Sequence, residues 1–98
     1  MNYKNEATDR LFEAILSLKN EEECAAFLED LCTVKELHDM GQRLETAVLL
    51  SEGTSYQKIS EKVGISSATV SRVNRCLVYG DGGYREIISR LKERKTNE

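Results

Sequence analysis

Residues 56–75, YQKISEKVGISSATVSRVNR, place apolar side chains at helical spacing on each side of a central glycine. Within each set the side chains lie three or four residues apart, so they share one face of a helix. The sets are Ile59 and Val63 before the glycine, and Val70 and Val73, continued by Leu77, after it. Gly64 can adopt the left-handed conformation in which many helices end, and Ser66 can cap the next helix with its side-chain oxygen. The pattern predicts a helix-turn-helix over residues 55–78.

The outward face of the second predicted helix carries small polar side chains and two arginines. With the valines turned inward, the exposed positions are Ser67, Ala68, Ser71, Arg72 and Arg75. Such groups suit contact with base edges and phosphates, and the second helix of this motif is the one that enters the DNA major groove. No acidic residue occurs from Lys62 to Gly80. A helix pair that only packs on a partner protein is the alternative interpretation.

The net charge of −3 conceals an uneven distribution along the chain. Residues 1–52 carry five basic and twelve acidic side chains, whereas residues 53–98 carry nine basic and five acidic ones. The acidity therefore belongs to the half without the motif. Because DNA binding depends on the local field, a basic face can neutralise phosphates although the whole chain is acidic.

The rest of the chain also follows a helical pattern. It contains no proline, and its apolar residues recur at helical spacing almost throughout, which predicts an all-α fold of six helices. We expect helices near residues 4–19 and 21–31. The buried side of the second would be formed by Ala25, Leu28 and either Leu31 or Phe27.

A third helix should follow the capping-box pattern of Thr33 and Glu36 and end at Gly53. It is apolar on more than one side, which predicts a position at the centre of the fold. A second capping box, Thr54 with Gln57, should start the helix-turn-helix.

The last predicted helix spans residues 83–95 after a glycine-rich turn, with Ile87, Ile88 and Leu91 directed inward. A chain of 98 residues is expected to form one domain, residues 1–98. Within it, residues 1–52 would be the dimerisation helices, because their apolar surface exceeds what a compact monomer can cover.

The patterns that would indicate catalysis or metal binding do not occur. Cys24, Cys32 and Cys76 have no CxxC or His/Cys spacing, and His38 has no neighbouring nucleophile to activate. We therefore expect no enzymatic activity, no metal and no cofactor. The sequence has neither a membrane-spanning stretch nor a signal-peptide core, so we expect a cytoplasmic protein with reduced thiols and no membrane contact.

Six helices in this order, with the motif in the fourth and fifth, resemble the Trp repressor superfamily. The matching positions lie in register over roughly residues 28–78. They are Leu31-Cys-Thr33, Glu36, Gly41-Gln-Arg43-Leu44, Leu49-Leu50, Gly53, Ile59, Gly64 and Ala68-Thr69-Val70-Ser71-Arg72. The run from Val63 to Tyr84 is more similar still to the bacterial branch of Trp-repressor-related proteins.

The resemblance implies an intertwined homodimer whose two motifs address successive major-groove faces of a pseudo-palindromic site. It implies that Ser67, Ala68 and Ser71 face the bases, and that Gln57 and Thr69 lie near phosphates. The predicted DNA-binding residues are therefore Gln57, Ser66, Ser67, Ala68, Thr69, Ser71, Arg72 and Arg75.

The resemblance also implies an effector pocket, in which Arg43 and Arg72 would hold an amino acid and Thr33 would contribute a further contact. This chain has Val73 where the tryptophan-binding protein has glycine, and Cys76 where the family pocket has serine. The extra carbons of valine would intrude on an indole ring, so we expect that tryptophan is not the corepressor. A different small-molecule effector stays open, as do phosphate contacts or pairing with Glu45 or Glu36 as the role of the two arginines.

The sequence thus predicts a transcriptional regulator, a repressor that occupies its operator, which binds double-stranded DNA sequence-specifically as a homodimer. The alternative is a protein-interaction or assembly module that has the shape of a helix-turn-helix and does not bind DNA.

Overall fold

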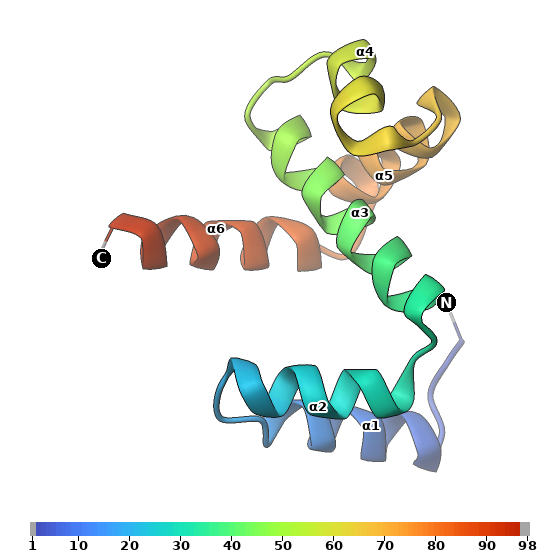
Figure 1. Cartoon of the computed structure of the whole chain (residues 1–98), viewed down its shortest axis with the longest axis vertical. Coiled ribbons are helices and arrows are strands. Elements are labelled where there is room, and N and C mark those ends of the chain that lie inside the picture. The colour runs from blue at the N-terminus through green and yellow to red at the C-terminus, as the bar shows by residue number, and fades with distance from the viewer. Residues whose placement is uncertain (1, 97–98) are drawn as a thin grey trace. The chain divides into compact units, whose positions relative to one another are not determined.

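The computed structural model describes residues 2–96, and within them every regular element is a helix (Figure 1). The predicted all-α fold with six α-helices is confirmed. The elements are α1 (Glu6–Leu16), α2 (Glu21–Leu31), α3 (Val34–Ser51), α4 (Tyr56–Ile59), the single π-helical turn η1 (Ser60–Gly64), α5 (Ser67–Tyr79) and α6 (Gly83–Thr96). Among these helices, none is both long and apolar enough to cross a bilayer.

The chain forms two compact units, one up to Leu37 and one from His38 onward, so α3 begins in the first and continues into the second. This division does not follow the functional segments predicted from the sequence. A single domain over 1–98, with dimerisation helices in 1–52, the motif in 55–78 and a last helix in 83–95, stays a prediction.

In the first unit, local hydrogen bonds set the ends of α1, which is shorter than the predicted 4–19. The Asn5 side chain accepts the backbone N–H of Thr8 at 2.9 Å, and the Thr8 hydroxyl accepts the N–H of Asn5 at 3.0 Å. The helix ends where the Ser17 hydroxyl donates to the carbonyl of Ala14. Because asparagine and serine compete with the backbone for hydrogen bonds, they favour helix ends over helix interiors.

The bounds of α2 agree with the prediction, but its predicted buried side is only partly correct. Phe27 and Leu28 are half-buried, whereas Ala25 and Leu31 are exposed. No described side chain of the first unit is fully buried. The first unit therefore has no closed apolar core of its own.

The predicted capping box at the start of α3 is confirmed. The Thr33 hydroxyl accepts the N–H of Glu36 at 3.0 Å, and the Glu36 carboxylate accepts the N–H of Thr33 at 2.9 Å. This backbone hydrogen bond holds the pKa of the Glu36 carboxyl below its usual value. At the other end of the helix, Gly53 has φ +83° and turns the chain toward α4.

The core of the second unit is built around the C-terminal half of α3. Ala47 packs with Val73 of α5 and Ile88 of α6. Two residues further along, Leu49 packs with Ile59 of α4 and Val70 of α5. One helix thus contributes to both apolar clusters, as the prediction of a central third helix required.

The helix-turn-helix consists of α4, η1 and α5, joined by a glycine in the left-handed conformation. Gly64 has φ +82°, as predicted. The predicted capping box of Thr54 and Gln57 is wrong, because Ser55 is the cap and accepts the N–H of Lys58 at 3.3 Å. The Gln42 amide of α3 donates to the Val63 carbonyl at 3.3 Å, which joins the turn to the central helix.

The predicted inward face of α6 is correct at one of three positions. Ile88 is buried, whereas Ile87 and Leu91 are each more than one-third exposed. Among the described residues of α6, Ile88 is buried in the core and Tyr84 packs partly buried against the same cluster.

Gly64→Ala should lower the free energy of unfolding by about 1–2 kcal/mol, because a Cβ in the left-handed conformation approaches the following carbonyl. Gly64→Asn should lose less, since asparagine tolerates that conformation. Chemical denaturation at a fixed protein concentration measures both variants. An alanine variant as stable as the original chain would contradict a conformational requirement at Gly64.

Candidate nucleic-acid interface

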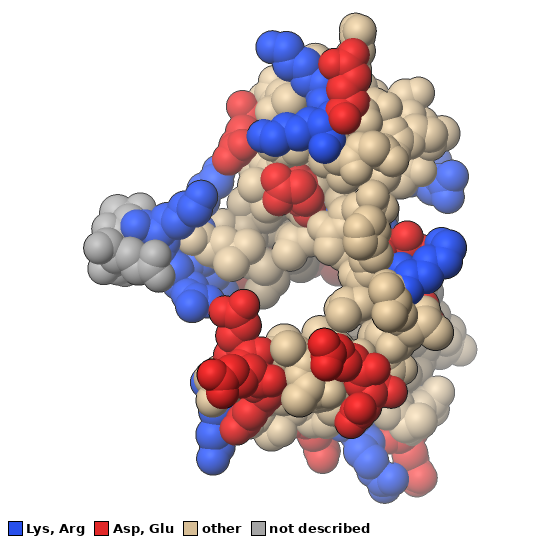
Figure 2. Space-filling view, viewed as in Figure 1, with Lys and Arg blue, Asp and Glu red and all other residues tan. Residues whose placement is uncertain are grey.

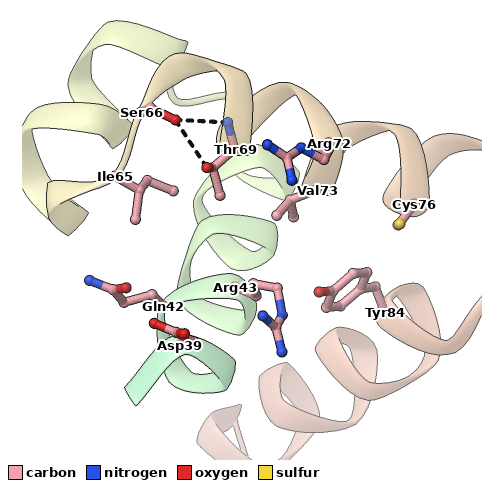
Figure 3. Close-up of a pocket in the computed structure, with 10 residues that line it drawn as sticks. All are labelled: Asp39, Gln42, Arg43, Ile65, Ser66, Thr69, Arg72, Val73, Cys76 and Tyr84. Carbon is pink, nitrogen blue, oxygen red and sulfur yellow. Dashed lines mark hydrogen bonds between the residues drawn. The ribbon is translucent and has the colours of Figure 1, made fainter. Parts of the chain in front are cut away.

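The start of α5 is held by a serine–threonine pair. The Ser66 side chain accepts the backbone N–H of Thr69 at 3.2 Å, and the two hydroxyl oxygens lie 3.0 Å apart (Figure 3). The first turn of α5 contains no acidic residue. Its free amides and the positive end of the helix dipole are therefore compatible with an approaching phosphate.

The exposed face of α5 is the one that the sequence predicts. Val70 is fully buried and Val73 is 4% exposed, so these two side chains direct the opposite side of the helix to solvent. The residues on that solvent side are Ser67, Ala68, Ser71, Arg72 and Arg75. The geometry leaves hydroxyl, methyl and guanidinium groups accessible on a helix whose position the core determines.

The other predicted contact residues are Gln57 on α4 and Ser66 and Thr69 at the start of α5. Gln57 is exposed on α4, and its amide donates to the Glu61 carboxylate at 3.4 Å. Thr69 is half-buried, and its backbone is tied to Ser66. Ser66 and Thr69 thus shape the start of α5, whereas Gln57 has a side chain that can turn outward.

The two units differ in the charge they carry on the surface. Figure 2 shows acidic side chains gathered over the first unit and basic side chains over the C-terminal half of α6. The basic residues of α6 in this region are Arg90, Lys92, Arg94 and Lys95. The electrostatic potential is therefore negative at this surface of the first unit and positive at the C-terminal half of α6.

A pocket of about 420 Å³ opens between α3, α5 and α6, behind the exposed face of α5 (Figure 3). It brings together four of the five predicted effector residues, Arg43, Arg72, Val73 and Cys76. The fifth, Thr33, belongs to the first unit, where it caps α3. The remaining lining residues are Asp39, Gln42, Ile65, Ser66, Thr69 and Tyr84.

Four pocket residues had no predicted role in the sequence analysis, namely Asp39, Gln42, Ile65 and the aromatic Tyr84 of α6. Its phenol points toward the guanidinium of Arg43 (Figure 3). Burial raises the pKa of the Tyr84 phenol, because a phenolate is poorly solvated there, and the positive charge of Arg43 opposes the shift. A large aromatic residue directly after a glycine-rich turn was the only signal in the sequence.

Val73 is shared between the core and the pocket. Its side chain belongs to the cluster with Ala47 and Ile88 and also lines the pocket. The Glu36 carboxylate accepts the N–H of Thr33, and the pairing of the two arginines with Glu45 or Glu36 stays a prediction. Both guanidinium groups are exposed toward the pocket region.

Comparison with known proteins decides the relationship that this geometry suggests. The sequence profile described as Trp repressor protein matches residues 6–92. The chain belongs to the Trp repressor family. Members of this family are helix-turn-helix regulators and are not enzymes. In the described part of the chain, no group of three or more metal-binding side chains is brought together.

Individual relatives place this Trp repressor family member in the YerC-like, Trp-repressor-related branch. It is 51% identical to the protein YerC of Bacillus subtilis (strain 168) over 88 residues, 90% of this chain and 85% of YerC. The crystal structure of a TrpR-like protein from Eubacterium eligens ATCC 27750 superposes with a TM-score of 0.88 at 48% identity, and covers 91% of this chain and 92% of that one. A second structure, from Staphylococcus aureus, gives 0.87 at 44% identity, with 91% and 89% covered.

Proposed function

We propose that this protein binds double-stranded DNA sequence-specifically as a homodimer and represses transcription by occupying an operator, with α5 as the recognition helix. The observation that carries the proposal is the solvent face of α5, which has two arginines, two serines and an alanine and no acidic residue. Base edges are read by such short polar and guanidinium groups in the major groove. Because a regulator meets the chromosome in the cytoplasm, we place the protein there.

The assignment of contacts follows from the position of each side chain. Ser67, Ala68 and Ser71 can approach base edges closely because they are short and exposed. Arg75 lies one turn after Ser71, where a longer side chain reaches bases or phosphates. Arg72 and Gln57 are assigned to the edges of the contact, and Ser66 and Thr69 to the helix start that faces a phosphate.

Selection from a pool of randomised duplexes, followed by a salt titration, tests the proposal. We expect one pseudo-palindromic sequence to be enriched, and its affinity to fall steeply with salt as counterions are released. Arg75→Ala and Arg72→Ala should each weaken binding. A lost base contact should cost about 1–3 kcal/mol at some positions only, and a lost phosphate contact should lower the salt slope by about 1.

Arg90→Ala is the matched control, because Arg90 is an exposed arginine of α6 that pairs with Glu86 at 3.3 Å. It should bind the selected duplex as the original protein does. If no sequence is enriched, the proposal fails, and the protein-interaction or assembly module becomes the better account.

We propose that the first unit forms the dimer contact. It has no fully buried described side chain, and it exposes large apolar groups, with Leu16 85% and Val34 87% accessible. Exposed apolar surface of this extent is typical of an interface. The intertwined arrangement of the family would cover it with the same helices of a second copy.

Light scattering at micromolar concentration should therefore report twice the chain mass of 11.1 kDa. Dilution should lower this value only as the protein concentration approaches the dissociation constant of the dimer. A mass of one chain at micromolar concentration would contradict the proposed dimer.

A small-molecule effector is a second candidate function, favoured by the pocket that holds Arg43, Arg72 and Tyr84 behind α5. Tryptophan does not suit this pocket, because Val73 is committed to the core and cannot withdraw from it. Forcing extra atoms into packed space costs about 1–3 kcal/mol.

Calorimetric titration with each amino acid tests the effector proposal. Tryptophan should give no binding heat, and a ligand that does bind should lose affinity in Arg43→Ala. Val73→Gly should make room for an indole ring but should also lower the stability of the fold. Tight binding of tryptophan to the original chain would overturn the steric argument. If no amino acid gives binding heat, an amino-acid effector is excluded.

A further inference from the structure

The C-terminal end of the recognition helix is bound by an arginine from another helix. The Arg85 guanidinium donates from Nε to the Leu77 carbonyl at 2.9 Å and from Nη2 to the Val78 carbonyl at 3.0 Å. These are two of the last four carbonyls of α5, and no N–H group further along the helix is available to donate to them. The carbonyl just before them, that of Cys76, accepts the N–H of Gly80 at 2.9 Å.

This end of α5 does not close in the way that glycine-terminated helices commonly do. Gly80 has φ −79° and ψ −168°, an extended conformation, so the chain leaves the helix instead of turning back over it. A Cβ at this position would collide with the Cys76 carbonyl, which explains the glycine. The bonds that a left-handed turn would supply to the last carbonyls come from Arg85.

Arginine suits this role for two reasons. Its positive charge lies at the negative end of the α5 dipole, which is favourable. The Nε–H and one Nη–H project in parallel from one edge of a planar group, so they can reach two successive carbonyls at once. Lysine carries the same charge but has no fixed pair of donors.

The residue before it, Tyr84, also joins α6 to α5. Tyr84 packs against the core cluster of Ala47, Val73 and Ile88. The first turn of α6 therefore holds α5 at two points, through the core at Val73 and through the carbonyls at its end. Neither contact involves the exposed serines or Ala68.

We infer that Arg85 is a positioning residue for DNA recognition: it fixes the angle of α5 against α6 and so the direction in which α5 presents its exposed face. The inference rests on the proposed function. The Arg85 hydrogen bonds hold the end of α5, and the turn at Gly64 holds its start, so α5 has little freedom to tilt against α6. Arg85 acts through α5 and makes no contact with DNA of its own.

Three variants of the full-length protein test the inference: Arg85→Ala, Arg85→Lys and, as a matched control on the same helix, Arg90→Ala. Binding to the selected duplex and its salt dependence are measured for each, at a temperature where circular dichroism shows full helicity. Hydrogen exchange of the last turn of α5 is measured without DNA. We expect Arg85→Ala and Arg85→Lys to bind about tenfold more weakly, on the order of one hydrogen bond to a charged group. Their salt slope should be unchanged, and exchange at the end of α5 should be faster.

Several results would overturn the inference. Unchanged affinity or exchange in Arg85→Ala would show that the Arg85 hydrogen bonds do not hold α5. Full rescue by Arg85→Lys would show that charge alone suffices, and a salt slope lowered by about 1 would show a direct phosphate contact instead. Failure of the proposed function is a different result, in which the original protein enriches no duplex. The exchange measurement then still decides whether Arg85 holds the two helices together.

Discussion

The packing of Val70 and Val73 against α3 determines what the second unit can present to a partner. Val70 meets Leu49 in one apolar cluster, and Val73 meets Ala47 in the other. Two contacts one turn apart fix both the rotation and the position of α5. Since burial of each valine contributes about 1.5–3 kcal/mol, a rotated helix would lose most of the core. The face opposite the valines is therefore held outward by the same contacts that fold the unit.

The same constraint shapes the pocket behind α5. The Val73 side chain cannot move out of the pocket without leaving a gap in the core. The part of the pocket wall that it forms is therefore rigid. Tyr84 adds a half-buried ring from α6, directed toward Arg43. Members of the Trp repressor family share the arrangement of helices around this space. In this chain, one wall of the space is a side chain of the core, Val73.

The parts of the fold that depend on neighbours in the chain could be predicted from the sequence. The left-handed Gly64, the cap at Ser66 and the capping box of Thr33 with Glu36 are set by residues within a few positions of one another. The cap of α4 also depends on neighbouring residues, but the sequence did not decide which residue forms it. Thr54 and Ser55 are adjacent, and either residue type can cap a helix.

Contacts between distant segments could not be read in this way. Tyr84 enters the pocket and Arg85 binds the carbonyls of α5 only because of the angle at which α6 leaves the glycine-rich turn. Ile87 and Leu91 match the helical period of a buried face, yet each is more than one-third exposed. Periodicity gives the apolar side of a helix, and the tertiary contact decides how much of that side is covered.

The most direct measurement of the central claim is photo-cross-linking from the exposed face of α5 to DNA. A photo-reactive amino acid in place of Ser71 should cross-link to bases of the selected duplex, at equivalent positions in its two half-sites. The same group in place of Glu86 on α6, also an exposed position, should give no cross-link to bases. A protein that binds the duplex but cross-links from position 86 and not from position 71 would contradict the assignment of α5 as the recognition helix.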